Sequence, residues 1–239
     1  MDEQSESKPD KPEEEKPKKK SKKKWIWISI ILFIFVILPL LAIGYTGLFN
    51  IPGLTHLFGS HKPIDLGVEI SDEAITSGLA KTPWKLSELP TPPSTSPLEV
   101  DRVYTGSVPV TNDVTSEEFS SFVNDRFQNS GVFESIQVRF YDGGAEASFK
   151  LNEFISSPIY IKSDITTTKD KTLSFDVKQI KIGRLPIPQN FVQQFEEAAT
   201  ELVSDRMSLV EGFSIERLIF KDNFVDFKGT YPETIELVE

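Results

Sequence analysis

The clearest feature of the hydropathy pattern is one long apolar run near the N-terminus. Residues 25–43 read WIWISIILFIFVILPLLAI, and the run extends to Tyr45. As a helix rising about 1.5 Å per residue, it would be about 32 Å long, enough to cross a bilayer core of about 30 Å. Trp25 and Trp27 at one end and Tyr45 at the other match the aromatic residues that lie at membrane interfaces. The pattern predicts a transmembrane helix over residues 25–46.

Positive charge lies directly before this run. Residues 16–24 read KPKKKSKKK, and Lys and Arg beside a first span stay on the cytoplasmic side. We therefore expect a single-pass signal-anchor in the plasma membrane, with the N-terminus cytoplasmic and the C-terminal part extracytoplasmic. The alternative is a cleaved signal peptide, whose apolar region has about 7–15 residues and ends at a small-residue cleavage site. The run here is longer, and residues 43–47 (IGYTG) match such a site poorly.

The segments on either side of the span have distinct compositions. Residues 1–24 are mostly Lys, Glu, Asp, Pro and Ser, so they are expected to form a disordered, Lys-rich cytoplasmic tail that cannot bury a core. Residues 47–70 scatter Leu, Phe and Ile among Gly and Pro, which predicts a juxtamembrane segment near the headgroups or packed on the domain. The extracytoplasmic domain then covers residues 71–239, with an exposed Pro-rich connection at about 82–99.

Helix start signals occur three times in this domain. Ser71 is followed by two acidic residues, which is typical of an N-cap and predicts a short helix ending at about Lys81. Thr115 and Glu118 form a capping box, which predicts a helix over about 116–129.

A later helix is expected to begin at a cap on Asn190, with Gln193 at the capping-box position. The second and third helices each carry an apolar stripe at helical spacing, which we expect to be buried. The stripes consist of Phe119, Phe122, Val123 and Phe127 in the second helix, and of Phe191, Phe195, Ala198, Leu202 and Val203 in the third.

The remaining segments alternate apolar and polar residues with the period of two that is typical of strands. The predicted strands lie at about 102–110, within 136–151, at 158–167 and 172–182, and at 213–221 and 224–230. Asp142-Gly143-Gly144 and residues 169–171 are the turns of two hairpins. Because runs of antiparallel strands are combined with helices rather than in strict β-α alternation, the predicted fold class is α+β.

Composition excludes several classes of function. The chain has 26 basic and 36 acidic residues, of which residues 1–24 hold nine and seven. The remaining residues therefore include 17 basic and 29 acidic ones, a net charge of -12. That balance disfavours nucleic acid, whose phosphates need clustered Lys and Arg. The chain has no Cys, which excludes disulfides and Cys-ligated metal centres. His56 and His61 have no third ligand type nearby, and we expect surface residues rather than a metal pair.

Catalytic motifs are absent from the sequence. There is no G-x-S-x-G elbow, P-loop or Rossmann glycine pattern. The acidic pairs Glu117–Glu118 and Glu196–Glu197 are neighbours on predicted helices, where solvated charge is the ordinary interpretation. The sequence therefore predicts a protein that is not an enzyme and uses no cofactor and no metal. Two carboxylates converging from distant strands would instead indicate a hydrolase of envelope polymers.

Four stretches of the domain carry a family resemblance: HLFGSHKPIDLGVEIS, TSEEFSSFVN, FYDGGAEASFKL and VKQIKIGRLPIPQNF. Together they resemble the YpmS-like membrane-anchored extracytoplasmic bacterial proteins, and more distantly the LmeA-like and tubular lipid-binding (TULIP) modules. The likeness covers roughly residues 54–230. It implies a long, curved antiparallel sheet packed around one or two amphipathic helices, with an apolar interior. The chain has room for one such unit.

Phenylalanine is the residue type that stands out in the domain, with 14 of the chain's 18. Aromatic stripes are usually core, but on a curved sheet they also line apolar grooves. With the resemblance, this predicts a non-enzymatic module that binds a lipid or other hydrophobic ligand at the membrane. The candidate groove residues are Phe119, Phe122, Phe191, Phe195 and Leu202. The alternative is an envelope scaffold whose acidic surface or Pro-rich segment binds another envelope protein.

Overall fold

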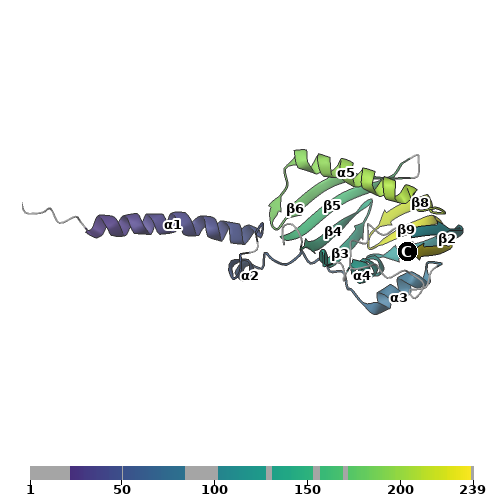
Figure 1. The fold of residues 1–239 in the computed structure, drawn as a ribbon, viewed down its shortest axis with the longest axis horizontal. Coiled ribbons are helices and arrows are strands. Elements are labelled where there is room, and N and C mark those ends of the chain that lie inside the picture. The colour runs from purple at the N-terminus through teal and green to yellow at the C-terminus, as the bar shows by residue number, and fades with distance from the viewer. Residues whose placement is uncertain are drawn as a thin grey trace, which may run out of the picture. The chain divides into compact units, whose positions relative to one another are not determined.

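The computed structural model describes residues 22–49, 51–83, 102–127, 131–152, 157–168 and 172–237. The predicted disordered tail up to residue 21, most of the Pro-rich connection and the turn at 169–171 lie outside these ranges. The chain divides into two units, Met1–Leu40 and Leu41–Glu239, which are described separately. The second unit combines antiparallel sheets with a few helices, so the predicted α+β class is confirmed (Figure 1).

The N-terminal apolar run is helical. Helix α1 spans Lys22–Thr46, has 25 residues and contains Pro39. The predicted helix over residues 25–46 is therefore present, and in residues 31–40 nearly all large apolar side chains are exposed. In the part of the chain that the structure describes, no helix meets the combined length and apolarity of a membrane span.

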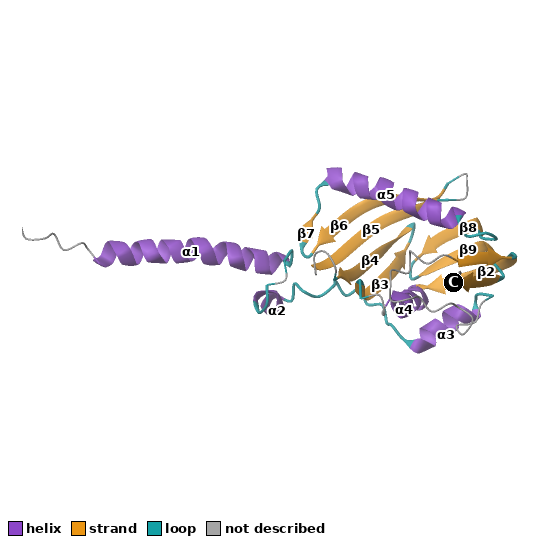
Figure 2. Ribbon diagram, viewed as in Figure 1, coloured by secondary structure: helices purple, strands orange, loops and turns teal. Residues whose placement is uncertain are grey.

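A five-stranded meander forms the larger sheet of the second unit. Its strands are β3 (Phe133–Tyr141), β4 (Gly144–Leu151), β5 (Ser157–Thr167), β6 (Leu173–Ile182) and β7 (Leu185–Pro186). They pair in chain order, each antiparallel to the next, and the sheet is curved (Figure 2). Both predicted hairpins are confirmed, because each predicted strand pair lies side by side in this order.

The other described strands form two smaller sheets. They contain β1 (Arg102–Thr105), β2 (Val108–Thr115), β8 (Ser214–Lys221), β9 (Phe224–Tyr231) and β10 (Thr234–Leu237), in the orders β2-β9-β8 and β1-β10. The single strand predicted at 102–110 is wrong, since two strands occupy this region and belong to different sheets. Gly106, at φ +74°, lies at the break, a conformation that favours glycine.

Local capping signals place two of the helices correctly. Helix α3 (Asp72–Ala80) begins after Ser71, whose Oγ accepts the Ala74 amide at 3.2 Å. Helix α4 (Ser116–Phe127) begins with the predicted capping box, in which Thr115 Oγ1 accepts the Glu118 amide at 3.2 Å and the Glu118 carboxylate accepts the Thr115 amide at 2.9 Å. Two further helices are α2 (Leu54–Phe58) and α5 (Gln189–Ser208).

The cap predicted for α5 is wrong. The N-cap residue is Pro188, and no side chain caps this end. The fixed φ of proline is already compatible with a helix start, so Asn190 lies inside the first turn instead of before it.

The buried face of α4 is also not the predicted one. Instead of the phenylalanine stripe, the side chains with least exposure are Ser116, Glu118, Ser120 and Ser121. The reason is that α4 lies along the outer edge of β3, where alternate backbone groups lack a neighbouring strand. Three α4 side chains four residues apart bond these groups: Ser116 to Phe140, Ser120 to Val138 and Asn124 to Ile136. The spacing fits, because four helical residues rise about 6 Å and two strand residues about 6.6 Å.

The two faces of the large sheet differ in chemistry. One face, the apolar face, carries Phe140, Ile161 and Val177, and Val177 and Ile180 of β6 pack with Val192 of α5. Residues 62–70 lie over the opposite, polar face, where the Leu66 amide donates to Gln137 Oε1 at 2.7 Å. The end of the predicted juxtamembrane segment therefore packs on the domain.

Candidate functional site

Helix α5 presents two different faces. Val192 is only 2 % exposed and packs on Val177 and Ile180 of β6. One turn later, the Glu196 carboxylate accepts the Val177 amide at 3.2 Å. These contacts fix the side of the helix that faces the sheet.

The predicted apolar stripe of α5 lies on a neighbouring face. At 3.6 residues per turn, Phe191, Phe195 and Leu202 point about a quarter turn away from Val192. Their exposed fractions are 56 %, 41 % and 49 %. The prediction that this stripe is buried is therefore wrong, because the helix meets the sheet through the narrower face that contains Val192 and Glu196.

This exposure leaves free energy available to a ligand. Fully burying a Phe or Leu side chain is worth about 1.5–3 kcal/mol. Covering the exposed half of three such side chains would contribute on the order of 3 kcal/mol. The α5 stripe, defined as Phe191, Phe195 and Leu202, is therefore a candidate surface for an apolar partner.

The two α4 candidates lie elsewhere. The ring of Phe119, which is 39 % exposed, lies 5.6 Å from that of Phe140, and Phe140 lies 5.8 Å from Phe220. Phe122 is partly buried, and the Arg126 guanidinium lies 5.4 Å from its ring centre. The five predicted groove residues thus fall into two groups on different helices, and only the α5 group forms an exposed stripe.

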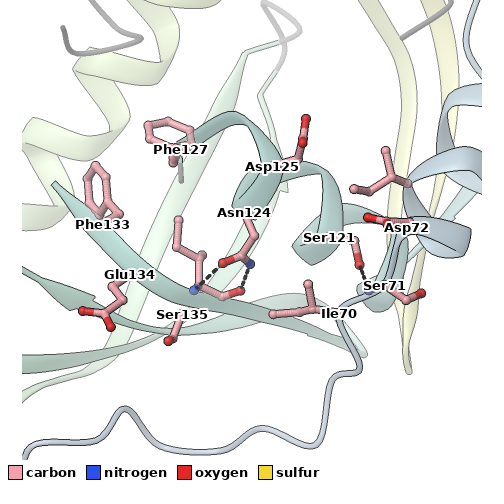
Figure 3. A pocket seen from close by; sticks show the side chains of 12 residues that line it. Ile70, Ser71, Asp72, Ser121, Asn124, Asp125, Phe127, Phe133, Glu134 and Ser135 are labelled. Atoms are coloured by element: carbon pink, nitrogen blue, oxygen red, sulfur yellow. Dashed lines mark hydrogen bonds between the residues drawn. The ribbon is translucent and has the colours of Figure 1, made fainter. Parts of the chain in front are cut away.

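A cavity of about 310 Å³ lies among α3, α4 and β3 (Figure 3). Its lining combines the carboxylates of Asp72, Asp125 and Glu134 with apolar side chains that include Phe127 and Phe133. Asn124 bonds the Ile136 backbone at its wall, and Ser121 accepts the Ser71 amide at 3.1 Å (Figure 3). None of the five predicted groove residues lines this cavity, so it is not the predicted groove.

The histidine pair shows no metal-site geometry. The rings of His56 and His61 are tilted by 34° with their centres 4.0 Å apart, and His61 Nδ1 lies 3.1 Å from the Thr55 carbonyl oxygen. Across the described ranges, no three His, Asp or Glu side chains gather as metal ligands.

An ionic cluster around the buried Glu146 carboxylate stabilises the polar face. The Glu146 carboxylate accepts Arg139 Nε at 2.6 Å and the Tyr160 hydroxyl at 2.5 Å. Burial and this carboxylate raise the pKa of Tyr160 to about 12, so the hydroxyl remains a donor at neutral pH. Leu66 and Val68 cover Tyr160. Because every member has a partner, we assign the cluster a structural role.

Sequence reasoning missed three cations that line a second cavity of about 300 Å³: Lys62, Lys181 and Arg184. They come from the loop after α2, from β6 and from the turn between β6 and β7. No motif links them, since only the fold brings them to one cavity.

No protein-family model matches this chain, and no curated protein or solved structure is detectably similar to it.

Proposed function

We propose that this protein is a non-enzymatic, membrane-anchored extracytoplasmic module that binds the acyl chain of a lipid on the α5 stripe. The observation that carries the proposal is the exposure of Phe191, Phe195 and Leu202 on one face of α5. The stripe is about 16 Å long from Phe191 to Leu202, at about 1.5 Å per residue. A linear apolar surface of this kind matches an extended hydrocarbon chain.

Membrane anchoring by residues 25–46 is part of the proposal. It is supported by the apolar composition of α1, by the exposed side chains of residues 31–40 and by the lysines that precede them. Protease added to intact cells should cut the chain beyond residue 60 and leave an N-terminal fragment in the membrane fraction. Recovery of intact protein in the soluble fraction would contradict this placement.

The lipid-binding proposal can be tested by photocrosslinking. Full-length protein in vesicles would be exposed to a phospholipid with a photoactivatable group on its acyl chain, and the crosslinked peptides mapped by mass spectrometry. We expect crosslinks on α5 in addition to α1. The double variant Phe195→Ser/Leu202→Ser should lose the α5 crosslinks and keep those on α1.

The matched control is Ile219→Ser, which removes an exposed apolar side chain from β8. It should leave the α5 crosslinks unchanged. Equal α5 labelling of the wild type and the double variant would overturn the proposal. So would a wild type without α5 labelling, and that result would leave the stripe to a protein partner, as the scaffold alternative predicts.

A further inference from the structure

Three cations line the second cavity without a carboxylate among them. Besides Lys62, Lys181 and Arg184, its walls are formed by uncharged residues of the 59–64 loop, by Pro158 and by Gly183. Residues 25–239 have a net charge of -12, so a cavity with three positive side chains stands out against its surroundings.

Within the described residues, none of the three cations forms a salt bridge. By contrast, Arg217 pairs with Asp226 at 2.8 Å and Lys228 with Glu216 at 2.6 Å. The Lys181 ammonium lies 5.1 Å above the ring of Tyr160, a contact that leaves its N–H donors free for an anion.

Arg184 is held in place by neutral groups. Its guanidinium donates to the Phe58 carbonyl at 2.7 Å and lies 4.6 Å from the ring centre of Tyr45. A guanidinium has five N–H donors, and one is used by Phe58. The side chain is therefore positioned in advance with donors to spare, which is the arrangement that phosphate-binding arginines use.

The cavity adjoins the end of α1. The Arg184 amide donates to the Thr46 carbonyl at 2.7 Å, and Ser60 Oγ donates to the Gly44 carbonyl at 2.6 Å. In the proposed placement, residues 44–46 lie at the outer membrane interface. The cavity would then be at the depth of the lipid headgroups.

We propose that Lys62, Lys181 and Arg184 form a binding site for the phosphate of an anionic phospholipid headgroup. The inference rests on the proposed membrane placement and deepens the proposed function by naming the lipid class. It does not depend on the α5 stripe, because the residues of the two sites differ. Lys and Arg near a membrane surface each contribute about fivefold in affinity for anionic lipid, so removing two of them should weaken binding about 25-fold.

The test compares two lipids with the same chains on the full-length protein in neutral detergent. One is dioleoyl phosphatidylglycerol and the other is dioleoylglycerol, which lacks the phosphate. Native mass spectrometry would measure retention of each. We expect the wild type to retain the phosphatidylglycerol more strongly. The variant Lys181→Gln/Arg184→Gln should lose this preference, with about 25-fold weaker binding of phosphatidylglycerol and unchanged binding of dioleoylglycerol.

The matched control is Arg217→Gln/Lys228→Gln, which removes the same two charges from β8 and β9. Both double variants retain the lysine-rich tail, so binding of anionic lipid to the tail is the same in the two proteins. Equal losses in the two variants would overturn the headgroup site. The stripe variant Phe195→Ser/Leu202→Ser should instead weaken both lipids alike, so failure of the stripe and failure of the headgroup site are separable.

A further measurement tests whether the cavity binds free inorganic phosphate instead of a lipid headgroup. Phosphorus NMR of the same samples would detect free phosphate bound by the cavity. Weak binding that phosphatidylglycerol displaces supports the lipid assignment. Phosphate binding as tight as that of the lipid would overturn it and make free phosphate the ligand.

Discussion

Replacing Ser120 by Ala tests the unusual contact between α4 and the edge of β3. Ser120 has no exposed surface, and its hydroxyl makes two bonds to one residue of the strand. Its Oγ accepts the Val138 amide at 2.8 Å and donates to the Val138 carbonyl at 3.0 Å. Ser120→Ala would remove both bonds without removing the apolar contacts of the helix.

The expected cost follows from these two backbone groups. A buried donor or acceptor that loses its partner costs about 1–3 kcal/mol, so two cost about 2–6 kcal/mol. Alanine recovers up to about 0.5 kcal/mol through its higher helix propensity. We therefore expect the free energy of unfolding to fall by about 3 kcal/mol, which is a large part of the stability of a typical domain.

Two measurements check this value on the full-length protein in detergent. Urea denaturation followed by circular dichroism gives the change in stability, and hydrogen exchange gives the protection of the Val138 amide. Exchange at Val138 should accelerate about 100-fold, since about 1.4 kcal/mol corresponds to a factor of ten. Ser208→Ala is the control, because that exposed hydroxyl bonds only the Asp205 carbonyl of its own helix, and stability should change by less than about 0.5 kcal/mol. If Ser120→Ala matched this control, the proposed role of the serine ladder would be wrong.

Two further predictions concern Glu118 and Gly183. Burial by itself raises the pKa of Glu118. Hydrogen bonds to the carboxylate, the strongest from Lys81, outweigh burial, so the net pKa lies below the ordinary value of 4.5. The ionised Glu118 carboxylate therefore stabilises the fold fully above about pH 4.5, and this stabilisation is lost as the pH falls through the folded pKa. In urea titrations, Glu118→Gln should lose less stability than the wild type between about pH 7 and pH 3. Gly183 and Gly59 both have positive φ angles, +59° and +63°. A Cβ at Gly183 would collide with the Thr46 carbonyl oxygen, whereas a Cβ at Gly59 would meet no atom within 4 Å. Gly183→Ala should therefore lower the thermal midpoint further than Gly59→Ala; equal shifts would show that backbone strain alone matters.

Signals confined to a few neighbouring residues predicted the local structure correctly. The cap at Ser71 and the capping box at Thr115 and Glu118 form as expected, because each needs only residues three apart in one helix turn. The hairpin through Asp142 and Gly143 is equally local, since its turn fixes the register of both strands. The α+β class followed from the order of such elements.

Helical periodicity identified the faces of α4 and α5 but not which face meets the sheet. On α4, the phenylalanines outweigh the serines on any hydropathy scale, yet Ser116 and Ser120 are buried because β3 has an unpaired edge. On α5, Val192 is the buried residue and Glu196 bonds the sheet beside it, while the more apolar stripe of Phe191, Phe195 and Leu202 is exposed. Knowing the order of strands in the sheet would have resolved the first case, and sequence alone does not provide it.

The junction between the end of α1 and the large sheet determines what the two proposed sites could do together. Ser157 Oγ donates to the Gly47 carbonyl at 2.8 Å, and the Arg184 amide donates to the Thr46 carbonyl, so residues 46–47 are bonded to β5 and to the β6–β7 turn. In the proposed membrane placement, a flexible tether would let the domain sample many depths above the bilayer. These bonds instead hold the basic cavity at a fixed position relative to Thr46. From Arg184 the chain passes through β7 directly into α5, at whose start Phe191 is exposed. Lys181 nevertheless lies over Tyr160 on the polar face of the large sheet, whereas α5 packs on Val177 and Ile180 of the apolar face. The basic cavity and the α5 stripe are therefore on opposite faces of the sheet, and the two proposals describe separate binding events that separate variants can test.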